Sequence, residues 1–259
     1  MAALVHIVQQ ALTAFERDAL RYRQHPLKLL YVPPHDIERL CALHLETRAR
    51  LGSKFFDLGR IEEGDWDLPA HNPLLQTSST DRSVHAHYME GVAWSKTAAF
   101  RIKLRRIDEG RIVDGCRSRA DLLKRYERLD RVAQDMARNG FRIMRNPKGE
   151  VDFSQILSVS LTRQGEALLG TGGKHRLAIA KLLKLPSIPV LVFLRHNLWQ
   201  QTLEAYFKGV HPAQKQLSSH PDLQENLEAP GVEETLSQRD KQPTGRRSLL
   251  VVAQEAAVR

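Results

Sequence analysis

The segment Gly-Gly-Lys-His-Arg at residues 172–176 has the residue types of a phosphate-binding turn. Glycines allow a tight turn and a close approach of a ligand to the backbone, because they carry no Cβ atom. A helix that begins at Lys174 would offer its first N–H groups and the positive end of its dipole to an anion. An arginine in its first turn would add a guanidinium that forks onto phosphate oxygens. We therefore predict a phosphate site made by Gly172, Gly173, Lys174, His175 and Arg176. The alternative is a glycine-rich helix start with two solvent-exposed basic residues.

Two other places hold polar residues that would suit the same pocket. The loop Gly64-Asp-Trp-Asp67 carries two carboxylates, and such a pair beside a nucleotide phosphate is suited to holding Mg²⁺. The alternative is an acidic surface turn that Trp66 anchors in the core. An Arg-His pair follows the buried run Ile188–Leu194, and strand ends beside a phosphate site often supply ligands. The candidate pocket residues are thus Asp65, Asp67, Arg195 and His196, with Mg²⁺ as a candidate ion and no metal site assigned.

The formal net charge of +9 is concentrated in one part of the chain. Residues 101–148 contain fifteen Lys and Arg against seven Asp and Glu, whereas residues 211–259 contain six against seven. A local excess of eight positive charges attracts phosphate-bearing partners, either nucleic acid or nucleotide. The alternative is a solvated, arginine-rich helix face.

Apolar periodicity and capping residues predict the elements that must position these side chains. Ser118 and Asp121 have the spacing of a capping box, an apolar stripe follows, and Asn139-Gly140 ends a helix over 119–139. Residues 155–161 alternate as a strand, and a helix over 174–183 leads to a buried strand at 188–194. Upstream we expect a helix at 3–24, a strand at 27–32, a short helix at 36–45, a strand near Phe55 and Leu58, and helices around 85–89 and 96–107.

The block from Ile156 to Val190 resembles the signature of the ParB/sulfiredoxin superfamily. That signature is a strand hairpin, a Gly-x-His-Arg-like helix start, a short helix and an Ile-Pro-Val strand. The resemblance covers residues 120–196, and a weaker one upstream, at 29–37 and 64–67, is similar to an uncharacterised branch. It implies a small mixed sheet that binds nucleotide phosphates at the helix start.

The family resemblance also has informative departures. Members include CTP-hydrolysing partition proteins, sulfiredoxins that use ATP, and free-serine kinases. Lys174 stands where sulfiredoxins carry the catalytic cysteine, and Cys41 and Cys116 lie outside the motif, so sulfinic-acid reduction is not expected. Gly172 stands where the kinase-like members usually have an acid. Nothing after residue 211 reads as the helix-turn-helix that partition proteins use for DNA.

Together these patterns predict an α/β (α+β) protein with a small mixed sheet of ParB/sulfiredoxin type. Residues 1–118 form its helical and mixed N-terminal region, 119–210 the ParB/sulfiredoxin-like core, and 211–259 a flexible tail. The predicted function is binding of a nucleotide (ATP, ADP or CTP) or another phosphorylated ligand, with phosphoryl transfer or nucleotide hydrolysis if the protein is an enzyme. The alternatives are a non-catalytic nucleic-acid-binding protein that uses the basic 101–148 surface, or an interaction module. Two cysteines and no apolar run of membrane length favour a cytoplasmic protein without a membrane partner.

Overall fold

A computed structural model describes residues 28–51, 58–145, 149 and 151–224. They form two compact units, which we describe separately: the first contains residues 28–74, 143–173 and 186–224, and the second contains 75–142 and 174–185. Within the described residues the chain thus passes between the units four times, whereas the sequence predicted divisions at residues 118 and 210. The helix predicted at 3–24 and residue Phe55 lie outside the described residues.

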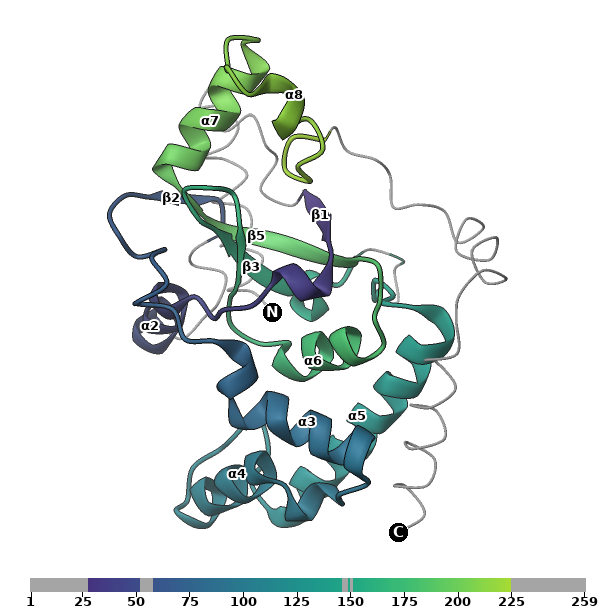
Figure 1. The fold of residues 1–259 in the computed structure, drawn as a ribbon. Helices are drawn as coiled ribbons and strands as arrows, with labels where there is room; N and C mark the ends of the chain where they lie inside the picture. Colours follow the sequence, from purple (N-terminus) through teal and green to yellow (C-terminus); the bar gives the residue numbers. More distant parts are fainter. Residues whose placement is uncertain (1–27, 52–57, 146–148, 150, 225–259) are drawn as a thin grey trace. The chain divides into compact units, whose positions relative to one another are not determined.

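The first unit is built on a five-stranded mixed sheet (Figure 1). Its central strand, β5 (Ile188–His196), has β3 (Leu157–Leu161) on one edge. The other edge pairs with β1 (Leu29–Val32) and, farther along, with β2 (Arg60–Glu62). Strands β2 and β3 run parallel to β5, β1 runs antiparallel to it, and β4 (Ala167–Leu169) runs antiparallel to β3. The predicted α/β class and small mixed sheet are confirmed.

The apolar sequence of β5 explains its central position. All nine of its residues are buried, as expected for a near-continuous apolar run covered on both faces. The register with β3 shifts between Val159 and Ser160, so that Phe193 is an extra residue on β5. Around the sheet lie the helices α2 (Ala42–Leu51), α7 (Asn197–Phe207) and α8 (Gln214–Leu217).

Two predicted elements of the first unit lie elsewhere along the chain. The expected helix at 36–45 is a 3₁₀ turn at Pro34–Asp36 followed by α2, which begins at Ala42. The strand expected near Leu58 is β2, which begins at Arg60. The 3₁₀ turn begins at Pro34, whose fixed φ suits the first position of a helix.

The beginning of the predicted tail, residues 211–224, is part of the first unit. Asp222 is fully buried and Leu223 is 4% exposed. The Lys28 ammonium donates to the Asp222 carbonyl at 3.1 Å, which ties this segment to the residues before β1. This packing was not predictable from composition, because a buried carboxylate and one buried leucine hold the segment in place of a periodic apolar pattern. Residues 225–259 lie outside the described residues.

The second unit consists of helices that pack on one another (Figure 1). They are α3 (Ser79–Glu90), α4 (Ala98–Asp108), α5 (Arg119–Asn139) and α6 (Lys174–Leu182). The predicted capping box of α5 is confirmed: the Ser118 hydroxyl accepts from the Asp121 amide at 3.1 Å, and the Asp121 carboxylate accepts from the Ser118 amide at 3.1 Å. No helix in the described ranges is long and apolar enough to span a membrane.

An aromatic cluster with one carboxylate forms the core of the second unit. Asp130 accepts from the Tyr88 hydroxyl at 2.9 Å and from Trp94 Nε1 at 2.8 Å. The His87 ring stacks on Trp94 with centroids 4.0 Å apart. Leu129 belongs to the apolar stripe of α5 but is half-buried, and its neighbour Asp130 takes the buried position, where it accepts from two buried donors.

Candidate functional site

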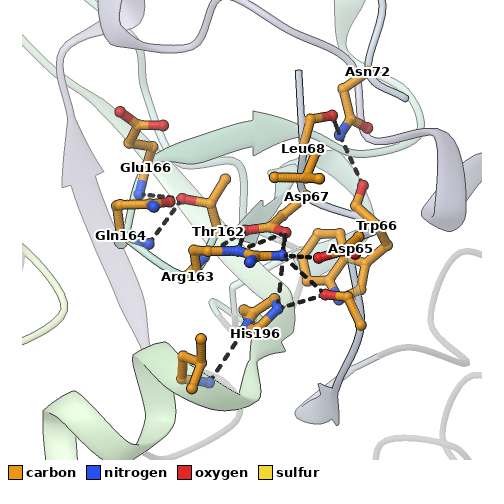
Figure 2. Close-up of polar contacts among 12 residues, drawn as sticks. Asp65, Trp66, Asp67, Leu68, Asn72, Thr162, Arg163, Gln164, Glu166 and His196 are labelled. Atoms are coloured by element: carbon orange, nitrogen blue, oxygen red, sulfur yellow. Dashed lines mark hydrogen bonds and ion pairs between the residues drawn. The ribbon is translucent and has the colours of Figure 1, made fainter. Parts of the chain in front are cut away.

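The predicted acidic pair in the first unit is bound by an arginine (Figure 2). The Arg163 guanidinium donates to both oxygens of Asp67, at 2.7 Å and 3.0 Å, and to Asp65 at 2.7 Å. The Arg163 backbone amide adds a further bond to Asp67 at 2.8 Å. Both Asp67 oxygens are therefore occupied, and the 64–67 loop is joined to the turn between β3 and β4. This arrangement supports the structural interpretation of the loop that the sequence left open.

The electrostatics of Asp67 agree with an ion pair. Burial alone would raise the pKa of this carboxyl, but the hydrogen bonds from Arg163 outweigh it and hold the pKa below its usual value. The side chain of Asp67 is 2% exposed and that of Asp65 is 70% exposed. Within the described residues no group of three or more His, Cys, Asp or Glu side chains is arranged to hold a metal ion. Binding of Mg²⁺ stays a prediction.

The other two predicted pocket residues, at the end of β5, also have partners in the first unit. Arg195 makes a two-pronged ion pair with the buried Asp222, at 2.8 Å and 3.0 Å. His196 Nε2 lies 2.8 Å from the Gly64 carbonyl, and its Nδ1 accepts from the Leu198 amide at the start of α7. Successive strand residues point to opposite faces, which is why neighbouring side chains serve different contacts. In the structure both side chains are engaged in polar contacts within the protein.

The glycines at 172 and 173 have the backbone conformation that the sequence motif predicts. Both have positive φ, +86° and +73°, a region that residues with a Cβ seldom adopt. A Cβ on Gly173 would also lie 2.8 Å from Leu157 Cγ. Helix α6 begins at the next residue, Lys174, as predicted.

Lys174 and His175, in the first turn of α6, belong to a cationic cluster in the second unit. Lys103 on α4 lies 2.7 Å from the Asp114 carboxylate, and Arg125 on α5 lies 3.4 Å from the same oxygen. The charges of Lys103 and Asp114 act on both Lys174 and His175. We call Lys103, Asp114, Arg125, Lys174 and His175 the α6 cluster.

A tight turn holds the carboxylate of the α6 cluster. Val113 and Cys116 exchange backbone hydrogen bonds at 3.1 Å and 2.9 Å, and the residues between them, Asp114 and Gly115, both have positive φ. An Asp-Gly pair with this geometry is typical of a type I′ turn. Burial alone would raise the pKa of Asp114, but Lys103 and Arg125 outweigh it and lower the pKa.

Burial and neighbouring positive charges lower the pKa values of two basic members of the α6 cluster. Burial, together with the charge of Lys103, lowers the pKa of the half-buried Lys174. Burial, followed by the charges of Lys103 and Arg125, lowers the pKa of His175 to about 3. His175 is therefore neutral at physiological pH. A bound anion would relieve these penalties, because its negative charge would balance the positive charges that Asp114 alone does not balance.

Arg176, the last residue of the predicted phosphate site, stacks on an aromatic ring. Its guanidinium carbon lies 5.7 Å from the centroid of Phe141, which follows α5 in the same unit. Sequence reasoning missed Lys103, Asp114 and Arg125, which lie 50 to 70 residues before α6 and share no local motif with it. The density of basic residues in 101–148 was the one signal that pointed to them.

Comparison with family models, with curated proteins and with solved structures finds no match to this chain. The resemblance to the ParB/sulfiredoxin superfamily therefore stays a prediction that rests on the residues quoted above. The geometry of the α6 cluster is what bears on function.

Proposed function

We propose that this protein binds a phosphorylated small molecule of the nucleotide class at the α6 cluster. The observation that carries the proposal is a charge imbalance: three cations, Lys103, Arg125 and Lys174, share the single carboxylate of Asp114. Amide N–H groups in the first turn of a helix lack intrahelical acceptors, so the start of α6 adds donors and a positive dipole end beside these cations. Phosphate oxygens can accept hydrogen bonds from these N–H groups and can pair with these cations.

The proposal is for binding, and turnover is a separate measurement. Asp114 is the one acid, within the described ranges, whose charge acts on both Lys174 and His175. Two cations already hold that carboxylate. Phosphoryl transfer or nucleotide hydrolysis would need a base to accept a proton from the attacking hydroxyl or water. The neutral imidazole of His175 accepts a proton only weakly, because its pKa is lowered to about 3.

Thermal stabilisation by ATP, ADP, CTP and GTP, with and without Mg²⁺, tests the proposal. A ligand at 100 times its dissociation constant stabilises the fold by about 2.7 kcal/mol. We expect one nucleotide to raise the melting temperature and Lys174→Met to remove that rise, because a charge-assisted contact contributes roughly ten- to a hundred-fold in affinity. Arg176→Ala tests the sequence motif in the same assay.

Arg111 provides the matched control. It is 67% exposed and pairs with Glu109 outside the α6 cluster, so Arg111→Ala should keep the parental response. If Lys174→Met and Arg111→Ala respond to the nucleotide as the parent does, the α6 cluster is not the binding site. If no nucleotide stabilises the parent, the proposed ligand class is wrong.

Nucleic-acid binding is the second candidate function, and the surface of α4 and α5 favours it. Six basic residues there are exposed and join no ion pair within the described part of the chain: Arg101, Arg105, Arg106, Lys124, Arg128 and Arg131. Binding through them should weaken steeply between about 50 and 200 mM salt. Charge reversal at Arg105, Arg106 and Arg128 together should abolish it; this triple variant spares Arg125, which holds Asp114. Unchanged affinity for duplex DNA and for RNA would identify a solvated face.

A further inference from the structure

Tyr126 lies in the middle of the residues that surround the first turn of α6. It is on α5 and is 2% exposed. Its ring meets the His175 ring edge-on, with centroids 5.7 Å apart, and Lys103 Nζ lies 5.8 Å from its centroid. The Trp94 ring packs on it at 4.6 Å. Tyr126 thus connects the aromatic core of the second unit to the α6 cluster.

The Tyr126 hydroxyl is buried and has no hydrogen-bond partner among the described residues, and the same is true of His175 Nε2. A buried hydroxyl without a partner costs free energy, so native proteins seldom keep one without a use. The second tyrosine of this core differs: the Tyr88 hydroxyl donates to Asp130 at 2.9 Å. Two tyrosines in one core therefore differ in whether the fold itself satisfies the hydroxyl.

Both of these buried groups are neutral hydrogen-bonding groups at physiological pH. Burial raises the pKa of Tyr126, so its hydroxyl stays protonated and can donate. Burial lowers the pKa of His175 to about 3, so one of its ring nitrogens carries a proton and the other does not. A phosphate oxygen is an acceptor without a proton of its own, and it would pair with such a donor as it pairs with the neighbouring cations.

We infer that Tyr126 is a ligand-binding residue whose hydroxyl donates to an oxygen of the anion bound at the α6 cluster. This inference rests on the proposed function and adds a residue that charge alone would not identify. The hydroxyl is kept without a protein partner because the ligand is its partner. His175 Nε2, which meets the same ring, is satisfied in the same event.

A pair of tyrosine variants tests the inference. Tyr126→Phe and Tyr88→Phe each remove one buried hydroxyl from the second unit, and calorimetric titration with ATP and with inorganic pyrophosphate measures affinity. We expect Tyr126→Phe to bind about ten- to a hundred-fold more weakly, with a melting temperature of the free protein equal to or above that of the parent. Tyr88→Phe should do the reverse: a lower melting temperature, because Asp130 loses a donor, and unchanged affinity.

The outcomes separate the inference from the proposed function. If Lys174→Met loses binding while Tyr126→Phe binds as tightly as the parent, the inference fails and the site stands. If Tyr126→Phe lowers the melting temperature of the free protein as much as Tyr88→Phe does, the hydroxyl has a protein partner and the inference fails. If neither probe binds the parent, or Lys174→Met leaves binding unchanged, the proposed site itself is wrong.

Discussion

The two units differ in how their charged clusters are balanced. In the first unit Arg163 is shared by Asp65 and Asp67, and Arg195 pairs with Asp222. In the second unit a single carboxylate among the described residues, that of Asp114, faces Lys103, Arg125 and Lys174. Where the carboxylates equal or outnumber the arginines, the charges are neutralised within the protein. A surplus of cations beside a helix N-terminus leaves charge for a ligand.

Burial separates the two units in the same way. The side chains of Arg195 and Asp222 are 7% and 0% exposed, whereas that of Asp114 is 39% exposed. Charges removed from water must be matched within the fold, because an uncompensated buried charge is very costly. Charges that keep contact with solvent can stay unmatched at small cost, and are then available to an anion. Loss of the central carboxylate should therefore cost far more stability in the first unit than in the second.

The largest expected effect is on stability in the first unit. Asp222→Ala should lower the free energy of unfolding by about 3–5 kcal/mol, because Arg195 would remain buried without its counter-ion. Trp199 Nε1, which donates to the same carboxylate at 3.0 Å, would lose its acceptor as well. Urea denaturation at pH 7 measures the change.

Asp114→Asn is the matched variant in the second unit. Asparagine tolerates the positive φ at this position, and the carboxylate it replaces is 39% exposed, so the loss should not exceed about 1 kcal/mol. The same variant should bind anions more tightly, since it removes the one negative charge. Equal losses for Asp222→Ala and Asp114→Asn would contradict the distinction between the two clusters.

The sequence predicted local features better than long-range pairs. Helix α5 follows from Ser118, Asp121 and Asn139-Gly140, all of which act within one helical turn of its ends. The start of α6 follows from two glycines in a conformation suited to them. The partnership of Asp222 with Arg195 spans 27 residues and that of Asp67 with Arg163 spans 96, and neither leaves a periodic signal. Helix ends could therefore be predicted from the sequence, whereas ion pairs between distant residues could not.

A second effect on the first unit is smaller than that of Asp222→Ala and depends on pH. Asp67→Asn should lower stability by roughly 1–3 kcal/mol at pH 7, since Asp67 loses its charge-assisted bonds to Arg163. The pKa of Asp67 is lower in the folded protein than in the unfolded chain. Its contribution is therefore complete above the unfolded pKa near 4 and is lost as pH falls through the folded value. The difference between parent and variant should shrink below about pH 4 in urea titrations.

A difference that is constant with pH would mean that charge is not what Asp67 contributes. Asp65→Asn, at a 70% exposed side chain, is the control.

The smallest expected effect on stability is that of Lys174→Met, and its sign is the sharpest test of a cation surplus. Within the described residues Lys174 forms no ion pair, and its pKa is lowered by burial and by Lys103. A base whose folded pKa is lowered binds its proton less tightly in the folded protein, so the charged form at pH 7 opposes folding. The penalty declines as pH rises past the folded pKa and is gone above the unfolded pKa. Lys174→Met should therefore change the free energy of unfolding by no more than about 0.5 kcal/mol, toward higher stability.

Lys103→Met, by contrast, removes the 2.7 Å pair with Asp114 and should destabilise the fold. If Lys174→Met lost as much stability as Lys103→Met, Lys174 would belong to a balanced network like those of the first unit. A lysine that opposes folding, yet whose removal abolishes anion binding, is retained for the ligand.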